Sequence, residues 1–580
     1  MDAAASWHRP ARRFWRHGRW QLELRGDELA DITFDGRIVL RSIRAVVRDA
    51  DWNTADWIVT ARGEGDTLCL DLRTEGSLGC HVSGSLVVEA TDRRLSVTLD
   101  AEVDAAFETN RTGLVVLHPP ALAGSELEVR HPQAAVERSI FPREISPHQP
   151  ARDISELAWT SGGLHVDVSF EGDVFEMEDQ RNWTDASYKT YSRPLTLPFP
   201  YQLDAGDRVR QRITVSLDNT DAAPAAPVDG DVLELTAGGL LPAIGLSAAT
   251  APDPAPAVSP IGTLVLVELD LASPSWRAAL QRARASGLPL DVRFVLDPGD
   301  PDALGPAVAA LADLPVARVA AFQPTGAARH VSDVAATAAL RDALDAAGLR
   351  AEVVGGARSH FTELNREIAR IPDDLDGVVF SLTPLFHSRD TEQMIESLRV
   401  QRLVAEEAVR LATGRPVHVG PVTLRPRFND VATAPPSYPT EADLRHGYGP
   451  ELLDATDARQ GAPELAAWTI ASAAALAVPG VSTLVFFEEW GPRGIRSAGG
   501  TDLPAASAVR ALAQFSGAPV LTGASPDGLV WAIGATSDHD TAVLVANLDA
   551  VVRAVTVRSP DGAARVELQP GAWSRVALMP

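Results

Sequence analysis

The run Gly377-Val-Val-Phe-Ser-Leu382 is followed, after a short polar stretch, by the helical pattern of Thr391–Ala412. An uninterrupted apolar strand that leads into a helix is the unit of parallel sheets, because both faces of such a strand are covered. The same pair of patterns recurs on both sides of this unit. The apolar runs that we predict as strands are Ala243–Leu246, Thr263–Val267, Leu290–Leu296, Val316–Phe322, Ala351–Gly355, Gly377–Leu382, Pro416–Gly420 and Ser482–Phe487.

Helical patterns lie between most of these runs. They are Ser275–Ser286, Val331–Ala347, Thr391–Ala412, Pro463–Ala477 and Ala505–Phe515. Eight continuous apolar strands with intervening helices favour a closed (β/α)₈ TIM-like barrel over an open sheet. No GxGxxG or phosphate-loop pattern opens any of the helices, which agrees with a barrel rather than an open nucleotide-binding sheet. The sequence therefore predicts a barrel domain over residues 231–517.

The segments on both sides of the barrel read as β structure. Residues 1–222 contain short alternating runs such as Trp20–Arg25 and Arg94–Leu99, separated by turn residues. Period-two alternation of this kind predicts an antiparallel β-sandwich. A proline-spaced link, residues 221–230, joins it to the barrel. The alternation returns over residues 518–580, where we predict a small C-terminal β-sandwich.

The composition excludes several classes of protein. The 580 residues carry 52 Lys and Arg against 77 Asp and Glu, a net charge of −25, and no basic stripe is present, so we expect no nucleic-acid partner. The two cysteines, Cys69 and Cys80, cannot form a disulfide framework or a four-thiolate zinc site. The first twenty residues lack the apolar region of a secretory signal, and no segment is typical of a membrane span. We expect a globular cytoplasmic protein with no membrane partner.

Polar residues just beyond the predicted strands are the candidate site, because barrel enzymes use the C-terminal ends of their strands. Glu268 and Asp270 end the second strand, and denser groups follow the later strands. The candidates from those groups are Arg358, His360, Glu363 and Asn365 after the fifth strand, His387 after the sixth, Arg425 and Arg427 after the seventh, and Glu488, Glu489 and Trp490 after the eighth.

Glu363 together with Glu488 or Glu489 would place two carboxylates across the barrel mouth. Such a pair suits glycoside hydrolysis, and it equally suits lactone hydrolysis by activated water. The structural alternative is that Glu363 caps a helix or pairs with Arg366, and that Glu488 and Glu489 pair with Arg493. The sequence has no HExxH, no HxH at a strand end and no GxSxG, so metal catalysis and a serine triad are the weaker options.

Candidate partners for a substrate surround these acids. Arginines at positions 358, 425 and 427 could hold a carboxylate or stabilise an oxyanion. His360 and His387 each follow a predicted strand, where a histidine could serve as a general base or could equally be a hydrogen-bonded support.

The most unusual stretch lies outside the predicted barrel, over residues 175–194. It contains Lys189, the only lysine of the chain. A single lysine among so many arginines suggests a role for a compact ammonium group, such as contact with a polyol. The alternative is an ion pair of Lys189 with Asp185 or Glu178 that fastens a long loop. The candidate substrate-binding residues of this stretch are Asp179, Arg181, Asp185, Tyr188 and Lys189.

Three motifs resemble the D-apionate lactonases, bacterial enzymes of apiose catabolism. They are Phe175-Glu-Met-Glu-Asp-Gln-Arg-Asn-Trp-Thr-Asp-Ala-Ser-Tyr-Lys-Thr-Tyr-Ser-Arg-Pro194 with Pro198-Phe-Pro-Tyr201, Gly355-Gly-Ala-Arg-Ser-His-Phe-Thr-Glu-Leu-Asn-Arg366, and Phe486-Phe-Glu-Glu-Trp-Gly491. The resemblance covers the whole chain, since that family also consists of a β domain, a barrel and a small C-terminal domain. It implies hydrolysis of D-apionolactone to D-apionate, a carboxylic ester hydrolase reaction, with a small sugar lactone as the partner and no organic cofactor.

Our hypothesis from the sequence is that water attacks a lactone carbonyl at the barrel mouth. Glu363 or His360 would be the general base, and Arg358 or Arg425 would stabilise the oxyanion. Glu488 or Glu489 would protonate the leaving alkoxide. A glycoside hydrolase with the same two acids is the alternative enzyme, and a sugar-binding protein on a barrel that has lost catalysis is the alternative outside enzymes.

Overall fold

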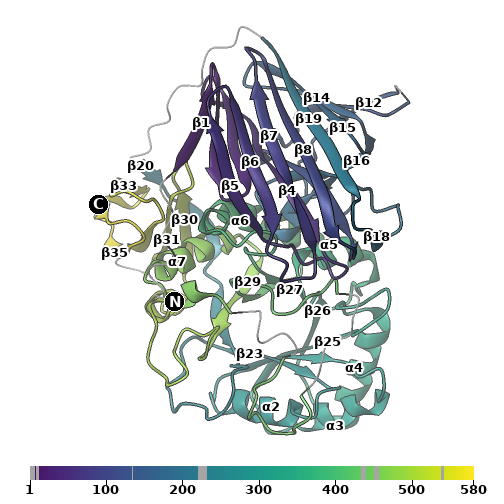
Figure 1. Cartoon of the computed structure of the whole chain (residues 1–580). Coiled ribbons are helices and arrows are strands. Elements are labelled where there is room, and N and C mark those ends of the chain that lie inside the picture. The colour runs from purple at the N-terminus through teal and green to yellow at the C-terminus, as the bar shows by residue number, and fades with distance from the viewer. Residues whose placement is uncertain are drawn as a thin grey trace.

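The structure is a computed structural model that describes Trp7 and residues 12–133, 135–219, 232–432, 439–449, 456–536 and 541–579. It has three parts, as Figure 1 shows: a large N-terminal β domain, a barrel below it, and a small β domain at the side of the barrel. The expected link at residues 221–230 lies outside the described residues. The predicted fold class is confirmed.

The N-terminal domain is built from two antiparallel sheets. Strand β8 shows why these residues form a sandwich. Every second residue, here Leu95, Val97 and Leu99, points into the core. The first sheet contains, in order, β1 (Arg13–His17), β2 (Trp20–Arg25), β3 (Glu28–Phe34), β4 (Arg37–Arg48), β10 (Arg111–His118), β17 (Tyr188–Tyr191), β16 (Phe175–Asp179) and β13 (Ala151–Ile154). The second contains β12 (Val136–Ile140), β11 (Glu126–Arg130), β14 (Glu156–Ser161), β15 (Leu164–Glu171), β19 (Arg208–Asn219), β8 (Arg94–Ala105), β7 (His81–Ala90), β6 (Thr67–Thr74) and β5 (Trp57–Glu64). A short pair, β9 (Phe107–Thr109) with β18 (Tyr201–Leu203), lies apart from both sheets.

Eight parallel strands close into a barrel, and each contains most of one predicted apolar run. The strands are β22 (Ala243–Ser247), β23 (Val265–Asp270), β24 (Leu290–Val295), β25 (Val316–Phe322), β26 (Glu352–Gly356), β27 (Gly377–Leu382), β28 (Val417–Val422) and β29 (Val481–Glu488). Parallel strands that are covered on both faces need little polar alternation, and every residue of β24, β27 and β28 is buried.

The helices around the barrel include the five that the sequence predicts. The described helices are α2 (Trp276–Arg284), α3 (Leu304–Ala309), α4 (Val334–Ala347), α5 (Phe361–Glu367), α6 (Thr391–Ala412), α7 (Glu464–Leu476) and α8 (Pro504–Ala513). The two helices that the sequence does not predict, α3 and α5, span six and seven residues, too few to show a helical period. Within the described part of the chain, no helix has both the length and the apolar character needed to cross a membrane.

Helix α7 explains why the C-terminal domain lies where it does. Its sequence from Leu465 to Leu476 is apolar on nearly all sides, and every one of these residues is buried. A helix of this kind needs cover on its outer face as well as on its barrel face. The cover comes from the C-terminal domain, whose Trp531 and Leu544 belong to the same hydrophobic core as Trp468 of the helix.

The C-terminal domain also includes two strands from the beginning of the predicted barrel range. Its three-stranded sheet contains β20 (Val232–Glu234), β33 (Arg553–Ser559) and β34 (Gly562–Leu568). Its five-stranded sheet contains β21 (Thr236–Leu240), β30 (Pro519–Ala524), β31 (Val530–Thr536), β32 (Thr541–Asn547) and β35 (Trp573–Ala577). The chain therefore enters the small domain before it starts the barrel, which ties the two parts together.

We predict that Trp468→Ala destabilises the protein by about 3–5 kcal/mol. The Trp468 side chain is fully buried, and its indole N–H donates to the Met394 carbonyl at 2.9 Å, so truncation leaves a cavity and removes a buried hydrogen bond. The free energy of unfolding from urea titration measures the loss. Val334→Ala is the control, because Val334 is 66% exposed at the start of α4, and we expect a change within about 0.5 kcal/mol. Equal stability of the two variants would contradict the role given to α7.

Candidate active site

A cavity of about 860 Å³, open solvent included, lies at the C-terminal ends of the barrel strands. We call it the barrel-mouth cavity. Leu266, Glu268 and Asp270 line it from β23, because alternate residues of a strand point to the same side. Ser247 at the end of β22 and Glu488 at the end of β29 line it from the neighbouring strands. A barrel collects side chains that are far apart in sequence in this way.

Glu268 forms one charged centre of the cavity together with two arginines. Its carboxylate accepts a hydrogen bond from Arg358 Nη2 at 2.5 Å and lies 3.3 Å from Arg427 Nη1. Burial acts to raise the pKa of Glu268, but Arg358 and Arg427 outweigh burial and lower this pKa to about 2. The centre therefore has two guanidinium groups and one ionised carboxylate at neutral pH. The ring of Phe428 lies under the Arg358 guanidinium, 4.2 Å away.

Glu488 forms the second charged centre. Its Oε1 accepts from Arg493 Nε at 2.8 Å and from the Thr250 hydroxyl at 2.8 Å, and its Oε2 accepts from the Thr250 backbone N–H at 3.0 Å. The first and last barrel strands pair directly, with Ser247 opposite Glu488, which brings the loop after β22 against this carboxylate. Both centres line the same cavity, so a small molecule between them would meet the Glu488–Arg493 pair on one side and Glu268 with its two arginines on the other.

Three of the predicted site residues line this cavity: Arg358, Arg427 and Glu488. Glu268 and Asp270 also line it, and reading the strand ends finds both, although the sequence gives no reason to prefer them to other polar strand ends. Thr250 and Arg493 line it as well. Thr250 follows the first strand by three residues and carries no motif, so only the structure identifies it.

Glu363 is not among the residues that line the barrel-mouth cavity. Its carboxylate turns back at the start of α5 and accepts from the Ser359 hydroxyl at 2.7 Å and from the His360 backbone N–H at 3.1 Å. This is the capping arrangement that the sequence analysis gives as the structural alternative. The predicted pairing of Glu363 with Glu488 across one mouth therefore has no support in the geometry.

Glu363 instead interacts electrostatically with a second buried acid, Asp430. Burial raises the pKa of Glu363, and burial together with the Glu363 charge raises the pKa of Asp430 well above its usual value. Both carboxylate oxygens of Asp430 are buried without a hydrogen-bond partner among the described residues. His360 lies 3.8 Å from Asp430, but burial lowers the pKa of His360 to about 3, so the imidazole is neutral and a weak base.

The remaining barrel candidates occupy the surroundings of the cavity. Burial raises the pKa of Glu489 to about 7, against the opposing effect of Arg496 and Arg282, yet Glu489 is not a lining residue. The Trp490 ring lies 4.8 Å from the Arg282 guanidinium, and Arg425 donates to the Thr456 carbonyl at 3.1 Å. None of these three side chains lines the barrel-mouth cavity.

Most of the candidates in the 175–194 segment hold the N-terminal domain together. Arg181 forms a buried ion pair with Asp179 at 2.7 Å and donates to the carbonyls of Pro142 and Glu144 at 2.8 and 3.1 Å. Tyr188 also donates to the Pro142 carbonyl, at 2.6 Å. These bonds fix the chain around residues 142–146, so the three side chains support structure.

The same segment fastens the N-terminal domain to the barrel. The Thr362 hydroxyl donates to the Asn182 carbonyl at 2.9 Å. The Asn365 amide donates to the Asn182 side-chain oxygen at 2.9 Å and to the Ile145 carbonyl at 3.0 Å. Trp183 stacks on Phe386, with ring centroids 4.3 Å apart. Asn365, a predicted substrate contact, therefore makes an interdomain contact.

Lys189, Asp185 and His387 line a second cavity, which lies between the first N-terminal sheet and α6. We call it the interface cavity. Lys189 pairs with Glu178 at 2.5 Å, one of the two partners that the sequence suggests, and His387 Nδ1 lies 2.6 Å from Asp185 Oδ2. Within the described residues, His, Cys, Asp and Glu side chains do not gather in groups of three that would hold a metal ion.

We predict that the Glu363–Asp430 pair makes the protein less stable as the pH rises. An unfolded Asp releases its proton near pH 4, whereas folded Asp430 keeps its proton to higher pH, because its pKa is raised. The folded state binds more protons in the range above pH 4, so the free energy of unfolding falls with pH there, by about 1.4 kcal/mol for each unit of raised pKa.

Asp430→Asn should remove this dependence. Urea midpoints at pH 5 and pH 8 measure it, and the fall between these values should be smaller in Asp430→Asn than in the unmodified protein. Asp313→Asn changes an exposed acid and is the control, which should behave as the unmodified protein does. The same fall in all three proteins would contradict the raised pKa of Asp430.

Comparison with known proteins gives two family matches that together cover most of the chain. Residues 2–220 match the model of the D-apionate lactonase N-terminal domain, and residues 243–517 match that of the D-apionate lactonase TIM barrel domain. A D-apionate lactonase from Brucella anthropi is 31% identical over 460 residues, which cover 71% of this chain and 73% of that protein.

Solved structures resemble the chain more distantly. A GH30 endoxylanase from Clostridium papyrosolvens C71 is 9% identical over 60% of this chain and 100% of its own, with a TM-score of 0.39. A galactose mutarotase-like protein from Lactobacillus casei ATCC 334 is 10% identical over 36% of this chain and 100% of its own, with a TM-score of 0.26. Similarity at this level carries no argument about activity.

Proposed function

Because the chain belongs to the D-apionate lactonase family, a family of lactone-ester hydrolases, we propose that it opens D-apionolactone to D-apionate in the barrel-mouth cavity. By the same resemblance, the reaction would belong to apiose catabolism. One observation supports this site most directly. The Glu488 carboxylate lines the same cavity as Arg358 and Arg427, whose two positive charges exceed the single negative charge of Glu268, and this cavity lies at the C-terminal ends of the strands.

The arginine centre supplies the electrostatic part of the proposed mechanism. When water adds to the lactone carbonyl, negative charge develops on the carbonyl oxygen. Arg358 and Arg427 carry two positive charges against the single negative charge of Glu268, so they can stabilise the developing oxyanion. The Arg427 side chain is 18% exposed, more than the 7% of Arg358, so Arg427 is the arginine that would contact the carbonyl oxygen.

Glu488 is the general base of the proposal. It takes a proton from water while the water oxygen bonds to the carbonyl carbon. When the ring carbon–oxygen bond breaks, the same proton passes to the alkoxide, so the products are a hydroxyl group and a carboxylic acid that ionises in water. Thr250 and Arg493 hold the Glu488 carboxylate in place.

The other acids fit this role less well. Glu268 has a pKa near 2, so it is a weak base, and its function is to orient the two arginines. Glu363 and Glu489 do not line the cavity, although burial raises the pKa values of both. The proposal thus keeps Glu488 and Arg358 from the sequence hypothesis, replaces Arg425 by Arg427, and leaves out Glu363 and His360.

We expect Glu488→Gln to lower kcat for D-apionolactone by about 10²–10⁴-fold, because the amide cannot accept the water proton. The ring opening is followed by the release of acid at constant pH. Glu489→Gln and Glu363→Gln are matched controls with the same chemical change at buried acids outside the cavity, and we expect their kcat to stay within about threefold of the unmodified enzyme.

Near-normal turnover by Glu488→Gln would contradict the assigned base. A large loss of kcat in Glu363→Gln alone, with an unchanged thermal midpoint, would indicate that the reaction takes place at Glu363 and Asp430 instead. Turnover of aryl glycosides without turnover of any lactone would favour the glycoside hydrolase alternative.

Arg427→Met should lower kcat by about 10²–10³-fold, since a donor to the developing oxyanion is lost. Steady-state kinetics separate this effect from binding: a transition-state role lowers kcat, whereas a raised KM with unchanged kcat would mean that Arg427 only holds the substrate. Arg402→Met, at a partly exposed arginine of α6, is the control and should leave both constants unchanged.

A further inference from the structure

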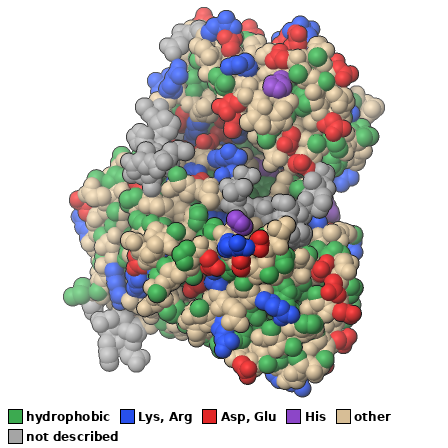
Figure 2. Space-filling model, turned by 60° about the horizontal axis from the view of Figure 1, so that its bottom comes forward, with side chains coloured by type: hydrophobic (Ala, Val, Ile, Leu, Met, Phe, Trp, Pro, Cys, Tyr) green, Lys and Arg blue, Asp and Glu red, His purple; other side chains and the backbone are tan. Residues whose placement is uncertain are grey.

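The interface cavity has about 710 Å³ of space, open solvent included, and none of its lining residues belongs to the proposed catalytic set. It lies between two domains, where sites for small molecules commonly occur. The first N-terminal sheet forms one wall, with Arg44 and Arg48 of β4 and Lys189 of β17. The start of α6 forms the other wall, with Asp390 and Glu392. Figure 2 shows acidic and basic side chains interspersed over the face of the molecule that it presents.

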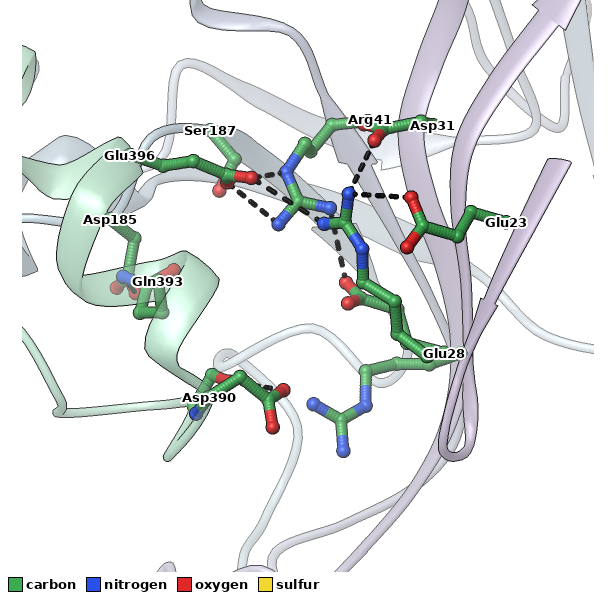
Figure 3. A network of polar contacts seen from close by, with 12 residues as sticks. Glu23, Glu28, Asp31, Arg41, Asp185, Ser187, Asp390, Gln393 and Glu396 are labelled. Atoms are coloured by element: carbon green, nitrogen blue, oxygen red, sulfur yellow. Dashed lines mark hydrogen bonds and ion pairs between the residues drawn. The ribbon is translucent and has the colours of Figure 1, made fainter. Parts of the chain in front are cut away.

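One part of the cavity wall is saturated by its own ion pairs, as Figure 3 shows. Glu396 of α6 lies 2.7 Å from Arg41 Nη2 and 3.4 Å from Arg25 Nη1. Arg25 also pairs with Glu23 at 3.1 Å, and Arg41 lies 3.5 Å from Glu28. These arginines have their counter-ions within the protein, so they hold the sheet against the helix and leave little charge for a ligand.

Arg48 differs from these arginines. Arg48 lines the cavity, yet its guanidinium makes no ion pair or hydrogen bond with any side chain in the described part of the chain. Glu178 and Asp185 are the acids that attract it, but both already have closer partners. Glu178 is bound by Lys189 at 2.5 Å, and Asp185 accepts from Gln393 at 2.7 Å.

An arginine of this kind favours an anionic ligand. Burial lowers the pKa of Arg48, but a guanidinium remains charged in proteins, so its partial loss of water is not compensated by a counter-ion. A carboxylate that enters the cavity would supply that counter-ion and could accept two parallel N–H bonds.

The acids of the opposite wall limit which anion can bind. The cavity is lined by five cations and also by five carboxylates, so a multiply charged phosphate would meet repulsion as well as attraction. Asp390 does not cap α6 with its side chain, and its Oδ2 accepts from the Ser388 hydroxyl at 3.0 Å. Carboxylates accept hydrogen bonds from hydroxyl groups, so this wall suits a polyol.

We propose that the interface cavity is a second binding site, which takes a small hydroxylated carboxylate of the aldonate class. Its carboxylate would pair with Arg48, and its hydroxyl groups would donate to Asp185 and to Asp390 at the start of α6. The ligand would join the N-terminal domain to the barrel, so binding raises the stability of the whole chain. The inference goes beyond the proposed function, because it needs no chemistry at the barrel mouth.

The test uses sodium D-gluconate as the probe and the thermal midpoint of the full chain as the readout. All measurements are made with Arg427→Met in place, so that binding at the barrel mouth is weakened. We expect a saturable rise of the midpoint with gluconate, of the size given by RT ln(1 + [L]/Kd), and we expect Arg48→Met to abolish it. Arg62→Met, at an exposed arginine of β5, is the matched control and should keep the full rise.

A second variant guards against misfolding. Arg48→Lys keeps the charge but loses the planar fork, so we expect about tenfold weaker gluconate binding at an unchanged midpoint without ligand. Sodium acetate and sodium phosphate at the same ionic strength should raise the midpoint less than gluconate does.

Four outcomes would overturn the proposal. An equal rise of the midpoint with acetate or phosphate would indicate a site for any anion. The rise could be absent, or it could persist when Arg48→Met is added. Finally, Arg48→Met alone, with Arg427 intact, should hydrolyse lactone with a kcat within twofold of the unmodified enzyme, and a loss of hydrolysis in this folded variant would move the catalytic site into the interface cavity.

Discussion

The hydrogen bonds between the first and last barrel strands, β22 and β29, are the constraint on which the rest of the structure depends. Their register sets Ala243 opposite Thr483 and Ser247 opposite Glu488, and it closes the ring. Closure brings Thr250 within hydrogen-bond distance of a carboxylate 238 residues away, and it completes a cavity that also holds Glu268 and its two arginines. Without this pairing, the charged residues of the chain would not share one site.

One short segment of the N-terminal domain contacts the barrel through buried polar and aromatic side chains, in addition to the ion pairs of Arg25 and Arg41 with Glu396. Residues 175–194 hold their own domain through Asp179 and Arg181 and contact the barrel through Asn182 and Trp183. Buried, fully bonded polar groups of this kind are costly to break, so they define one docking geometry. The only lysine of the chain lies at the edge of this contact, paired with Glu178, where the interface cavity begins.

The sequence predicts the fold better than it predicts the site. Apolar runs and helical periods identify all eight barrel strands, because burial on both faces leaves a strong local signal, and the family resemblance and the hydrolase class are also confirmed. The site depends on the direction of single side chains. Glu363 is the third residue of α5, a seven-residue helix that is too short to show a helical period in the sequence. Its carboxylate turns back toward the His360 backbone. Glu268 gains its importance from Arg358 and Arg427, which are distant in sequence.

The most direct measurement of the central claim is a crystal structure of the protein with the lactam analogue of D-apionolactone, whose amide bond resists hydrolysis. Our account predicts that the ring lies in the barrel-mouth cavity, with its carbonyl oxygen on Arg427 and a water molecule between its carbonyl carbon and Glu488. An analogue bound only in the interface cavity, or beside Glu363 and Asp430, would contradict it.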